Sequence, residues 1–446
     1  MRDYLVLLSI PGLRERDVAV MKNLRAAVMG GEIADLTPSF PAVTCPVQAA
    51  MTTGQPASQH GVIANGFCWR EKNTVEMWTS PNDCIQQPQI WNLLGQQGEN
   101  LTSAVWFPLH SKHCRADYVC TPAPIHNPDG SESLWCYTRP EELYGTLRDE
   151  LGHFPLQHFW GPMANIAASN WIADSAAHAA RQWKPNFFYI YLPHLDYAAQ
   201  RTGPDSAAAD QAVADLDELL GRLFEQLREA YDTDPLWIVA GEYAITPVRH
   251  VAYPNRILRE AGLLTVREQD DGEHLDFEAS AAFAMVDHQF SHVFVKNGDA
   301  DTVRRVVDVF SSERGIDEVL SADQLAKYNL NHARSGEVVL VSKPDSWQAY
   351  YWWLDDDHAP AFARTVDIHR KPGYDPVELH FDPATKSIPL NATLIKGSHG
   401  APVRDNYQRT VILSTEPGLF PHHTGMQDTD IFQVIAREFQ LRLPPQ

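Results

Sequence analysis

The chain has 446 residues, 44% of them hydrophobic, so it is long enough to bury one large core or two. Its 36 basic and 57 acidic residues give a net charge of −21, which argues against a long nucleic acid as partner, because phosphate contacts need lysine and arginine. No run of about 20 apolar residues exists, so we expect no membrane contact and a soluble, cytoplasmic protein. The six cysteines lack zinc-ribbon spacing, and we expect reduced thiols. The oligomeric state is left open.

Four short apolar runs are typical of buried parallel strands. They cover residues 4–10, 102–107, 186–193 and 236–242. Between the last two, residues 206–231 carry apolar side chains at steps of three and four, which predicts a long amphipathic helix. Strands that alternate with helices predict an α/β fold with a mainly parallel central sheet.

The character of the sequence changes after about residue 265. A charged stretch is followed by strand-like runs such as AFAMVDHQFSHVFVKN and GEVVLVSK, and from about residue 390 the chain resumes core-like segments. We therefore expect residues 1–265 and 386–446 to form the core. Residues 266–385 are expected to form a smaller α+β lid.

Polar side chains suited to catalysis lie where predicted strands end. Thr44, Asp196, Glu242 and His399 each occupy such a position. Because parallel strands end at one edge of a sheet, we expect these side chains to converge there. Carboxylates and imidazole are good ligands for a divalent metal, and a hydroxyl beside such an ion becomes a better nucleophile. The pattern favours phosphoryl or sulfuryl transfer.

Spacing around Thr44 carries further information. The segment contains, in order, Thr44, Pro46, Thr53, Gly54, His60, Gly61 and Asn65. It resembles the nucleophile segment of the type I phosphodiesterases and nucleotide pyrophosphatases of the alkaline phosphatase superfamily, and Asp196 and the pair His399-Gly400 are similar to later phrases of that family. Phrases such as LPHLDYAAQRTGP and KGSHGAP also look like a divergent bacterial branch of it.

This resemblance implies an alkaline-phosphatase-like sandwich that acts on a small phosphorylated molecule. It implies that Thr44 is the nucleophile and that Asn65 contacts a phosphate oxygen. It also implies a divalent metal, with zinc expected and manganese or another ion as the alternative. Asp196, His399 and Glu242 would be its ligands.

The chain departs from the family pattern at several metal-binding positions. Pro11 stands where the family has its first metal-binding Asp, Gln200 replaces a His, and Glu242-Tyr243 replaces Asp-His. Cys45 stands where an aromatic residue usually stacks on a nucleobase, so we expect little base preference. Residues of the lid that could complete a rearranged metal centre are Asp287 and His288, followed by His292, Asp367, His369 and Asp375.

Three hypotheses for function follow from these observations. The first is a metal-dependent hydrolase of phosphodiesters or phosphomonoesters, in which Thr44 attacks phosphorus and Asn65 steadies the oxyanion. The second is a degenerate, non-catalytic relative that binds a small ligand or a partner. The third keeps the metal chemistry but acts on a sulfate ester or a phosphonate. Metal analysis separates the first from the second.

Overall fold

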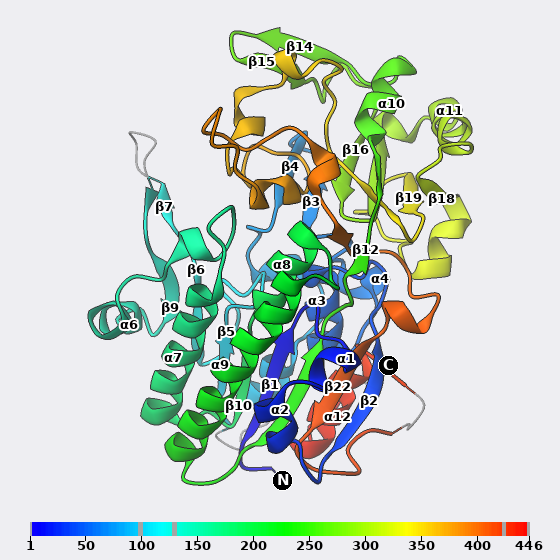
Figure 1. The fold of residues 1–446 in the computed structure, drawn as a ribbon. Helices are drawn as coiled ribbons and strands as arrows, with labels where there is room; N and C mark the ends of the chain where they lie inside the picture. Colours follow the sequence, from blue (N-terminus) through cyan, green and yellow to red (C-terminus); the bar gives the residue numbers. More distant parts are fainter. Residues whose placement is uncertain (1, 97–100, 127–131, 422–424, 444–446) are drawn as a thin grey trace.

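The protein is described by a computed structural model that covers residues 2–96, 101–126, 132–421 and 425–443. Within these residues the main sheet has nine strands in the order β23-β2-β22-β11-β1-β10-β5-β6-β9 (Figure 1). Their bounds are β1 Leu5–Ile10, β2 Glu32–Thr37, β5 Ser103–Trp106, β6 Tyr118–Pro122, β9 Cys136–Arg139, β10 Phe187–Tyr191, β11 Leu236–Gly241, β22 Thr410–Ser414 and β23 Met426–Gln427.

The strands predicted from the sequence are neighbours in this sheet. β1 pairs in parallel with β10 on one side and with β11 on the other, and β10 pairs in parallel with β5. β22 runs antiparallel to β11 and β2, and β9 runs antiparallel to β6. The predicted α/β fold with a mainly parallel central sheet is confirmed.

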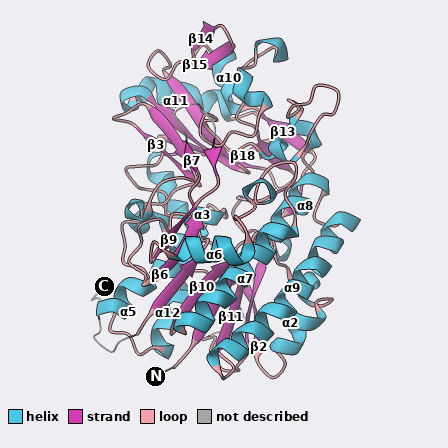
Figure 2. Ribbon diagram, turned by 90° about the vertical axis from the view of Figure 1, so that its left-hand side faces the viewer, coloured by secondary structure: helices cyan, strands magenta, loops and turns pink. Residues whose placement is uncertain are grey.

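Two helical layers cover the sheet, because successive side chains of a strand point to opposite faces. Leu5 and Leu7 of β1 face a core shared with one set of helices, and Val6 and Leu8 face the core of the other set. Figure 2 shows the sheet between these layers. The first set is α3 Thr44–Thr53, α5 Ile90–Gln96 and α12 Asp430–Glu438, and the second is α2 Lys22–Ala27, α7 Ile166–Trp183 and α9 Ala207–Tyr231.

The predicted amphipathic helix is α9, and its start has a local cause. The side chain of Ser206 accepts a hydrogen bond from the backbone N–H of Ala209, which satisfies one of the donors left free at a helix N-terminus. The apolar residues at steps of three and four are buried against α7 and the sheet. This helix therefore begins and ends where the sequence predicts it.

A second, smaller sheet lies above the first in Figure 1 and contains four antiparallel strands in the described residues. Its order is β16-β17-β19-β18, with β16 Ala282–Asp287, β17 Phe290–Val295, β19 Val338–Ser342 and β18 Ile316–Ser321. The helices α10 Pro254–Glu260 and α11 Ala300–Phe310 pack beside it. Its core also takes in Val248 and Ile395, which lie outside the expected lid of residues 266–385. The exact lid boundaries stay a prediction.

Short elements connect these parts. They are α1 Glu15–Val18, α4 Ala57–His60, α6 Leu143–Leu151, α8 His194–Thr202, β3 Gly66–Trp69 with β4 Thr74–Met77, β12 Thr246–Pro247 with β21 Gly397–Ser398, β13 His250–Ala252 with β20 Ser346–Gln348, and β14 Val266–Gln269 with β15 Gly272–Leu275. All six cysteines are buried and none forms a disulfide. Among the helices in the described ranges, none is long and apolar enough to cross a bilayer.

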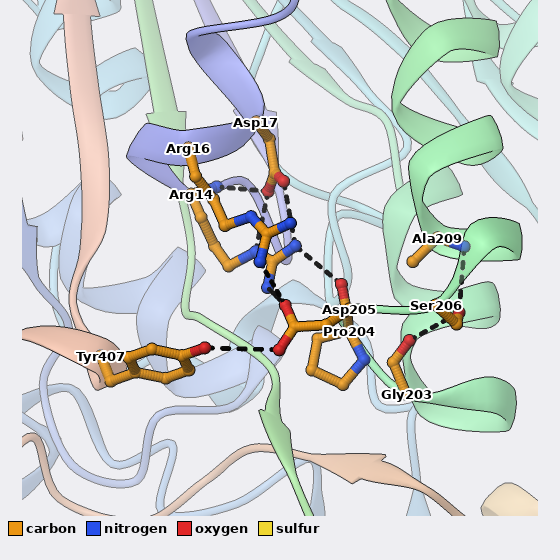
Figure 3. A network of polar contacts seen from close by, with 9 residues as sticks. All are labelled: Arg14, Arg16, Asp17, Gly203, Pro204, Asp205, Ser206, Ala209 and Tyr407. Atoms are coloured by element: carbon orange, nitrogen blue, oxygen red, sulfur yellow. Dashed lines mark hydrogen bonds and ion pairs between the residues drawn. The ribbon is translucent and has the colours of Figure 1, made fainter.

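A partly buried ion-pair network ties the segment after β1 to the loop between α8 and α9 (Figure 3). The guanidinium of Arg14 makes two bonds of 2.9 Å to the carboxylate of Asp17, a third of 2.9 Å to Asp205, and one of 2.8 Å to the carbonyl of Pro204. The side chains of Arg14 and Asp17 are only 10% and 5% exposed. This network holds the end of β1 beside α8.

Replacing Arg14 with methionine is expected to lower the free energy of unfolding by about 3 kcal/mol, because it leaves the buried Asp17 carboxylate unpaired. Urea denaturation measures the change. Arg16 is the matched control, since it also pairs with Asp205 but its side chain is 53% exposed. Arg16→Met is expected to cost less than about 1 kcal/mol. Equal losses in the two variants would contradict this account.

Candidate active site

Thr44 is the first residue of α3 and lies at the carboxyl-end edge of the main sheet. The preceding residue, Val43, has an extended backbone, so the helix begins sharply at Thr44. The Thr44 hydroxyl lies 3.0 Å from the phenol oxygen of Tyr243, the second residue after β11. The side chain therefore points at the end of a neighbouring strand, beside the positive end of its own helix.

Asp196 lies in the first turn of α8, just beyond β10. Its Oδ1 accepts a long hydrogen bond of 3.5 Å from the hydroxyl of Tyr243, and its Oδ2 accepts one of 2.9 Å from the amide of Gln200. Burial raises the pKa of Asp196 to about 7, against the opposing effect of these hydrogen bonds. Tyr243 thus connects Thr44 to Asp196.

His399 follows β21, and its ring faces Asp196. Its Nδ1 donates to the backbone carbonyl of Ala42 at 2.8 Å, which leaves Nε2 as the unprotonated nitrogen of the neutral ring. Burial lowers the pKa of His399 well below its usual value. Its Nε2 is buried without a hydrogen-bond partner in the described residues and lies 3.9 Å from Oδ1 of Asp196. A lone pair is therefore available beside a carboxylate.

Asn65 and the lid residue Asp287 form a hydrogen-bonded pair beside Thr44. The side-chain oxygen of Asn65 accepts from the N–H of Cys45, while its amide nitrogen and its backbone N–H both donate to Asp287, at 3.0 and 2.8 Å. Nδ1 of His288 bonds the same carboxylate at 2.5 Å. Burial raises the pKa of Asp287 to about 6. Both oxygens of Asp287 are thus used in orienting other groups.

Four rings beside Thr44 form two stacked pairs that are joined by a tilted contact. Tyr243 lies on His399 with centroids 3.6 Å apart and planes 5° apart, and His288 lies on Tyr374 with centroids 3.6 Å apart. His288 and His399, whose centroids are 3.9 Å apart, join the two pairs. The rings of His288 and Tyr374 therefore lie against the His399 side of this site. No pattern in the sequence indicates a role for Tyr374, because its stacking depends on contacts between segments that are distant in the chain.

Glu242 lies at the end of β11 but takes part in a different network. Its Oε1 accepts hydrogen bonds from the hydroxyl of Ser9 and, at 2.7 Å, from the amide of Gln48. Its Oε2 is buried without a partner in the described residues. Burial raises the pKa of Glu242 to about 8. Burial therefore favours the protonated form of this carboxyl group.

The remaining lid candidates are engaged elsewhere. Asp375 pairs at 2.8 Å with the buried Lys371, which also binds Glu378 at 2.6 Å. The Asp367 carboxylate accepts from backbone N–H groups of the turn that follows it. His292 bonds the carbonyl of Ile63 at 3.0 Å. The structure brings none of these three candidates to Thr44.

The possible metal ligands near Thr44 fit one metal ion better than two. The described residues contain no group of three or more His, Cys, Asp and Glu side chains that could hold a metal. Asp196 and the unpartnered Nε2 of His399 nevertheless fit two ligands of one ion. A second ion does not fit, because Pro11 offers no side-chain ligand and the Tyr243 hydroxyl lies between Thr44 and Asp196.

A threonine at a helix start, grouped with a carboxylate just beyond the parallel strand β10 and with a buried imidazole that follows β21, is suited to hydrolysis by nucleophilic attack. Residues 5–375 match the sequence profile of the type I phosphodiesterase / nucleotide pyrophosphatase family. The chain belongs to this family, and the resemblance seen in its sequence is confirmed.

Solved structures have the same fold at low sequence identity. Murine ectonucleotide pyrophosphatase / phosphodiesterase 5 is 15% identical, with a TM-score of 0.63 over 99% of this chain and 96% of that one. The same mouse protein is also known as an inactive threonine-to-alanine variant in complex with AMP. Phosphonoacetate hydrolase from Sinorhizobium meliloti 1021, in complex with phosphonoformate, is 14% identical, with a TM-score of 0.62 over 98% of this chain and 96% of that one.

A curated relative matches over a shorter region. It is an uncharacterised pyrophosphatase/phosphodiesterase of Schizosaccharomyces pombe, 23% identical over 199 residues, which are 44% of this chain. The match covers 34% of that protein, about a third of its length.

Proposed function

We propose that this protein hydrolyses phosphoesters of small molecules, with Thr44 as the nucleophile. The observation that carries the proposal is the Thr44 hydroxyl at the start of α3, hydrogen-bonded to Tyr243 and grouped with Asp196 and His399. Membership of a phosphodiesterase family supports it. The inactive threonine-to-alanine variant of the mouse relative indicates that a threonine is essential in that protein, which also supports the proposal.

The reaction has two displacement steps. The oxygen of Thr44 loses its proton to the buffer and forms a bond to phosphorus, while the bond from phosphorus to the leaving oxygen breaks and that oxygen takes up a proton to leave as an alcohol. Water then attacks phosphorus and the bond to Thr44 breaks, which gives the phosphate product and restores the Thr44 hydroxyl. Asn65 has one amide N–H bonded to Asp287, so its second N–H remains for a phosphoryl oxygen. A divalent ion held by Asp196 and His399 would supply positive charge to the phosphoryl oxygens.

Assay of the purified protein tests the proposal. Nitrophenyl phosphomonoester and phosphodiester substrates are offered with and without a chelator, beside a nitrophenyl sulfate and a phosphonate ester. The expected result is turnover of a phosphate ester that the chelator suppresses. Faster turnover of the sulfate or the phosphonate would favour that alternative substrate class. No turnover of any ester, with or without added metal, would favour the non-catalytic alternative, a protein that binds a small ligand or a partner.

Metal content gives a second test of the site. We expect at most one tightly bound divalent ion per chain, lost in Asp196→Ala and in His399→Ala, because these side chains supply the ligands that fit. Asp287→Ala is the matched control, since both of its oxygens are hydrogen-bonded to other groups. Elemental analysis of each variant measures the ion. Two stoichiometric zinc ions that persist in Asp287→Ala would contradict the one-ion site.

Little preference among nucleobases is expected. Cys45 is buried among Ala49, Val62 and Phe67 and offers no flat surface to a base. An aromatic side chain at this position would add about 1–3 kcal/mol to the binding free energy of a base by stacking on it. Rates on nitrophenyl esters of the four nucleoside monophosphates are therefore expected to agree within about tenfold. Selection of one base by a larger factor would show that another part of the chain recognises it.

A further inference from the structure

The hydroxyl of Tyr243 lies between the proposed nucleophile and a buried carboxylate. It is 3.0 Å from the oxygen of Thr44 and 3.5 Å from Oδ1 of Asp196. The side chain is 1% exposed and its ring lies flat on His399. Its backbone carbonyl accepts a hydrogen bond of 2.9 Å from the N–H of Gly12. Backbone and ring are thus both held, so the position of the phenol oxygen is well defined.

The chemistry of the two neighbours sets the direction of the hydrogen bonds. The hydroxyl of Tyr243 donates to Oδ1 of Asp196, so the phenol oxygen is left to accept the proton of Thr44. In this arrangement the O–H of Thr44 is directed toward Tyr243, while the hydroxyl of Tyr191 is a second polar neighbour of Thr44. The lone pairs of Thr44 therefore point away from Tyr243, where they can meet phosphorus.

We propose that Tyr243 is a positioning residue that aligns the hydroxyl of Thr44 for attack. This inference rests on the proposed function of Thr44. A phenol suits the role because a single oxygen donates to Asp196 and accepts from Thr44 at the same time. Phenylalanine would preserve the ring on His399 and lose both hydrogen bonds. The positioning role can therefore be separated from packing.

The test compares wild type with Tyr243→Phe, using Tyr351→Phe as the matched control. Tyr351 is also a buried tyrosine, but it lies in the core of the second sheet and its hydroxyl has no hydrogen-bond partner in the described residues. We expect Tyr243→Phe to lower kcat by about 100-fold with KM within about threefold, because misalignment of reacting groups costs on this scale. Tyr351→Phe is expected to keep both constants within about threefold.

Covalent labelling gives a readout that does not depend on turnover. An aryl fluorophosphonate is added; the Thr44 oxygen bonds to phosphorus, the bond to fluorine breaks, and fluoride and the threonine proton leave to the buffer. Mass spectrometry follows the labelled peptide. Tyr243→Phe is expected to slow labelling of Thr44 about 100-fold, whereas loss of packing alone would lower the melting temperature without this selective effect. Tyr243→Leu, which also lacks a hydrogen-bonding side chain, replaces the Phe variant if that one does not fold.

The outcomes separate this inference from the proposed function. A folded Tyr243→Phe protein whose kcat and labelling rate stay within about threefold of wild type, beside an inactive Thr44→Ala protein, would overturn the positioning role alone. A wild type that neither turns over an ester nor takes label at Thr44 would overturn the proposed function, and the positioning role with it.

Discussion

Thr44→Ala is expected to lower kcat on a nitrophenyl phosphoester by about 1,000-fold or more. The variant removes the oxygen that bonds to phosphorus, and the remaining groups can only bind the substrate or polarise it. Steady-state kinetics measure the loss. Acid quenching during turnover is expected to trap a phosphoryl group on Thr44 in the wild type and not in the variant.

Two variants of the same helix act as controls for this prediction. Thr44→Ser keeps a hydroxyl and is expected to keep turnover within about tenfold of the wild-type rate. Thr53 is also a buried threonine of α3, but its hydroxyl bonds the carbonyl of Ala49 at 2.7 Å. Thr53→Ala is expected to change kcat by less than about threefold. Normal turnover by Thr44→Ala would assign nucleophilic attack to another group.

Glu242→Gln is expected to stabilise the metal-free protein at high pH. Glu242 has a pKa of about 8 in the folded chain, raised by burial from an ordinary value of 4.5. Unfolding therefore releases a proton between pH 4.5 and 8, and wild-type stability falls as pH rises through this window. The free energy of unfolding falls by about 1.4 kcal/mol per pH unit in this window, so the wild type has lost roughly 3–5 kcal/mol by pH 8. Glutamine imitates the protonated carboxyl and does not titrate.

Chemical denaturation of both proteins across the pH range, with a chelator present, measures this difference. The two are expected to be equally stable near pH 4, and the variant more stable at pH 8. Glu225→Gln, on the exposed side of α9, provides the control and is expected to follow the wild type at every pH. Parallel stability curves for wild type and Glu242→Gln would mean that Glu242 is not kept neutral by burial.

Much of the fold could be predicted because its cause is local. A strand buried on both faces reads as a continuous apolar run, as in LVLLSI of β1, and a helix against a sheet reads as apolar residues at steps of three and four, as in α9. Alternation of the two then favours a parallel sheet. The lid is different: its strands are recognisable in the sequence, but its core draws on residues as far apart as Phe40 and Ile395.

The candidate site could be predicted only in part. The expectation that side chains after strand ends converge named Thr44, Asp196 and His399, and the structure brings them together. His399, however, follows the short antiparallel strand β21 and not a strand of the main sheet. What each side chain binds could not be predicted, because the partners are distant in the chain. Asn65 and Asp287 are 222 residues apart, and Thr44 and Tyr243 are 199 apart.

The sequence by itself determined the α/β class, the family and the strand ends at which polar groups gather, since each of these depends on local pattern and spacing. Only the tertiary structure decided that Glu242 faces Ser9 and Gln48, that Asp287 orients Asn65, and that Tyr243 lies between Thr44 and Asp196. The reason is physical. Direction and length of a hydrogen bond depend on how whole layers pack, and a shift of about one ångström, which no local pattern encodes, is enough to exchange one partner for another.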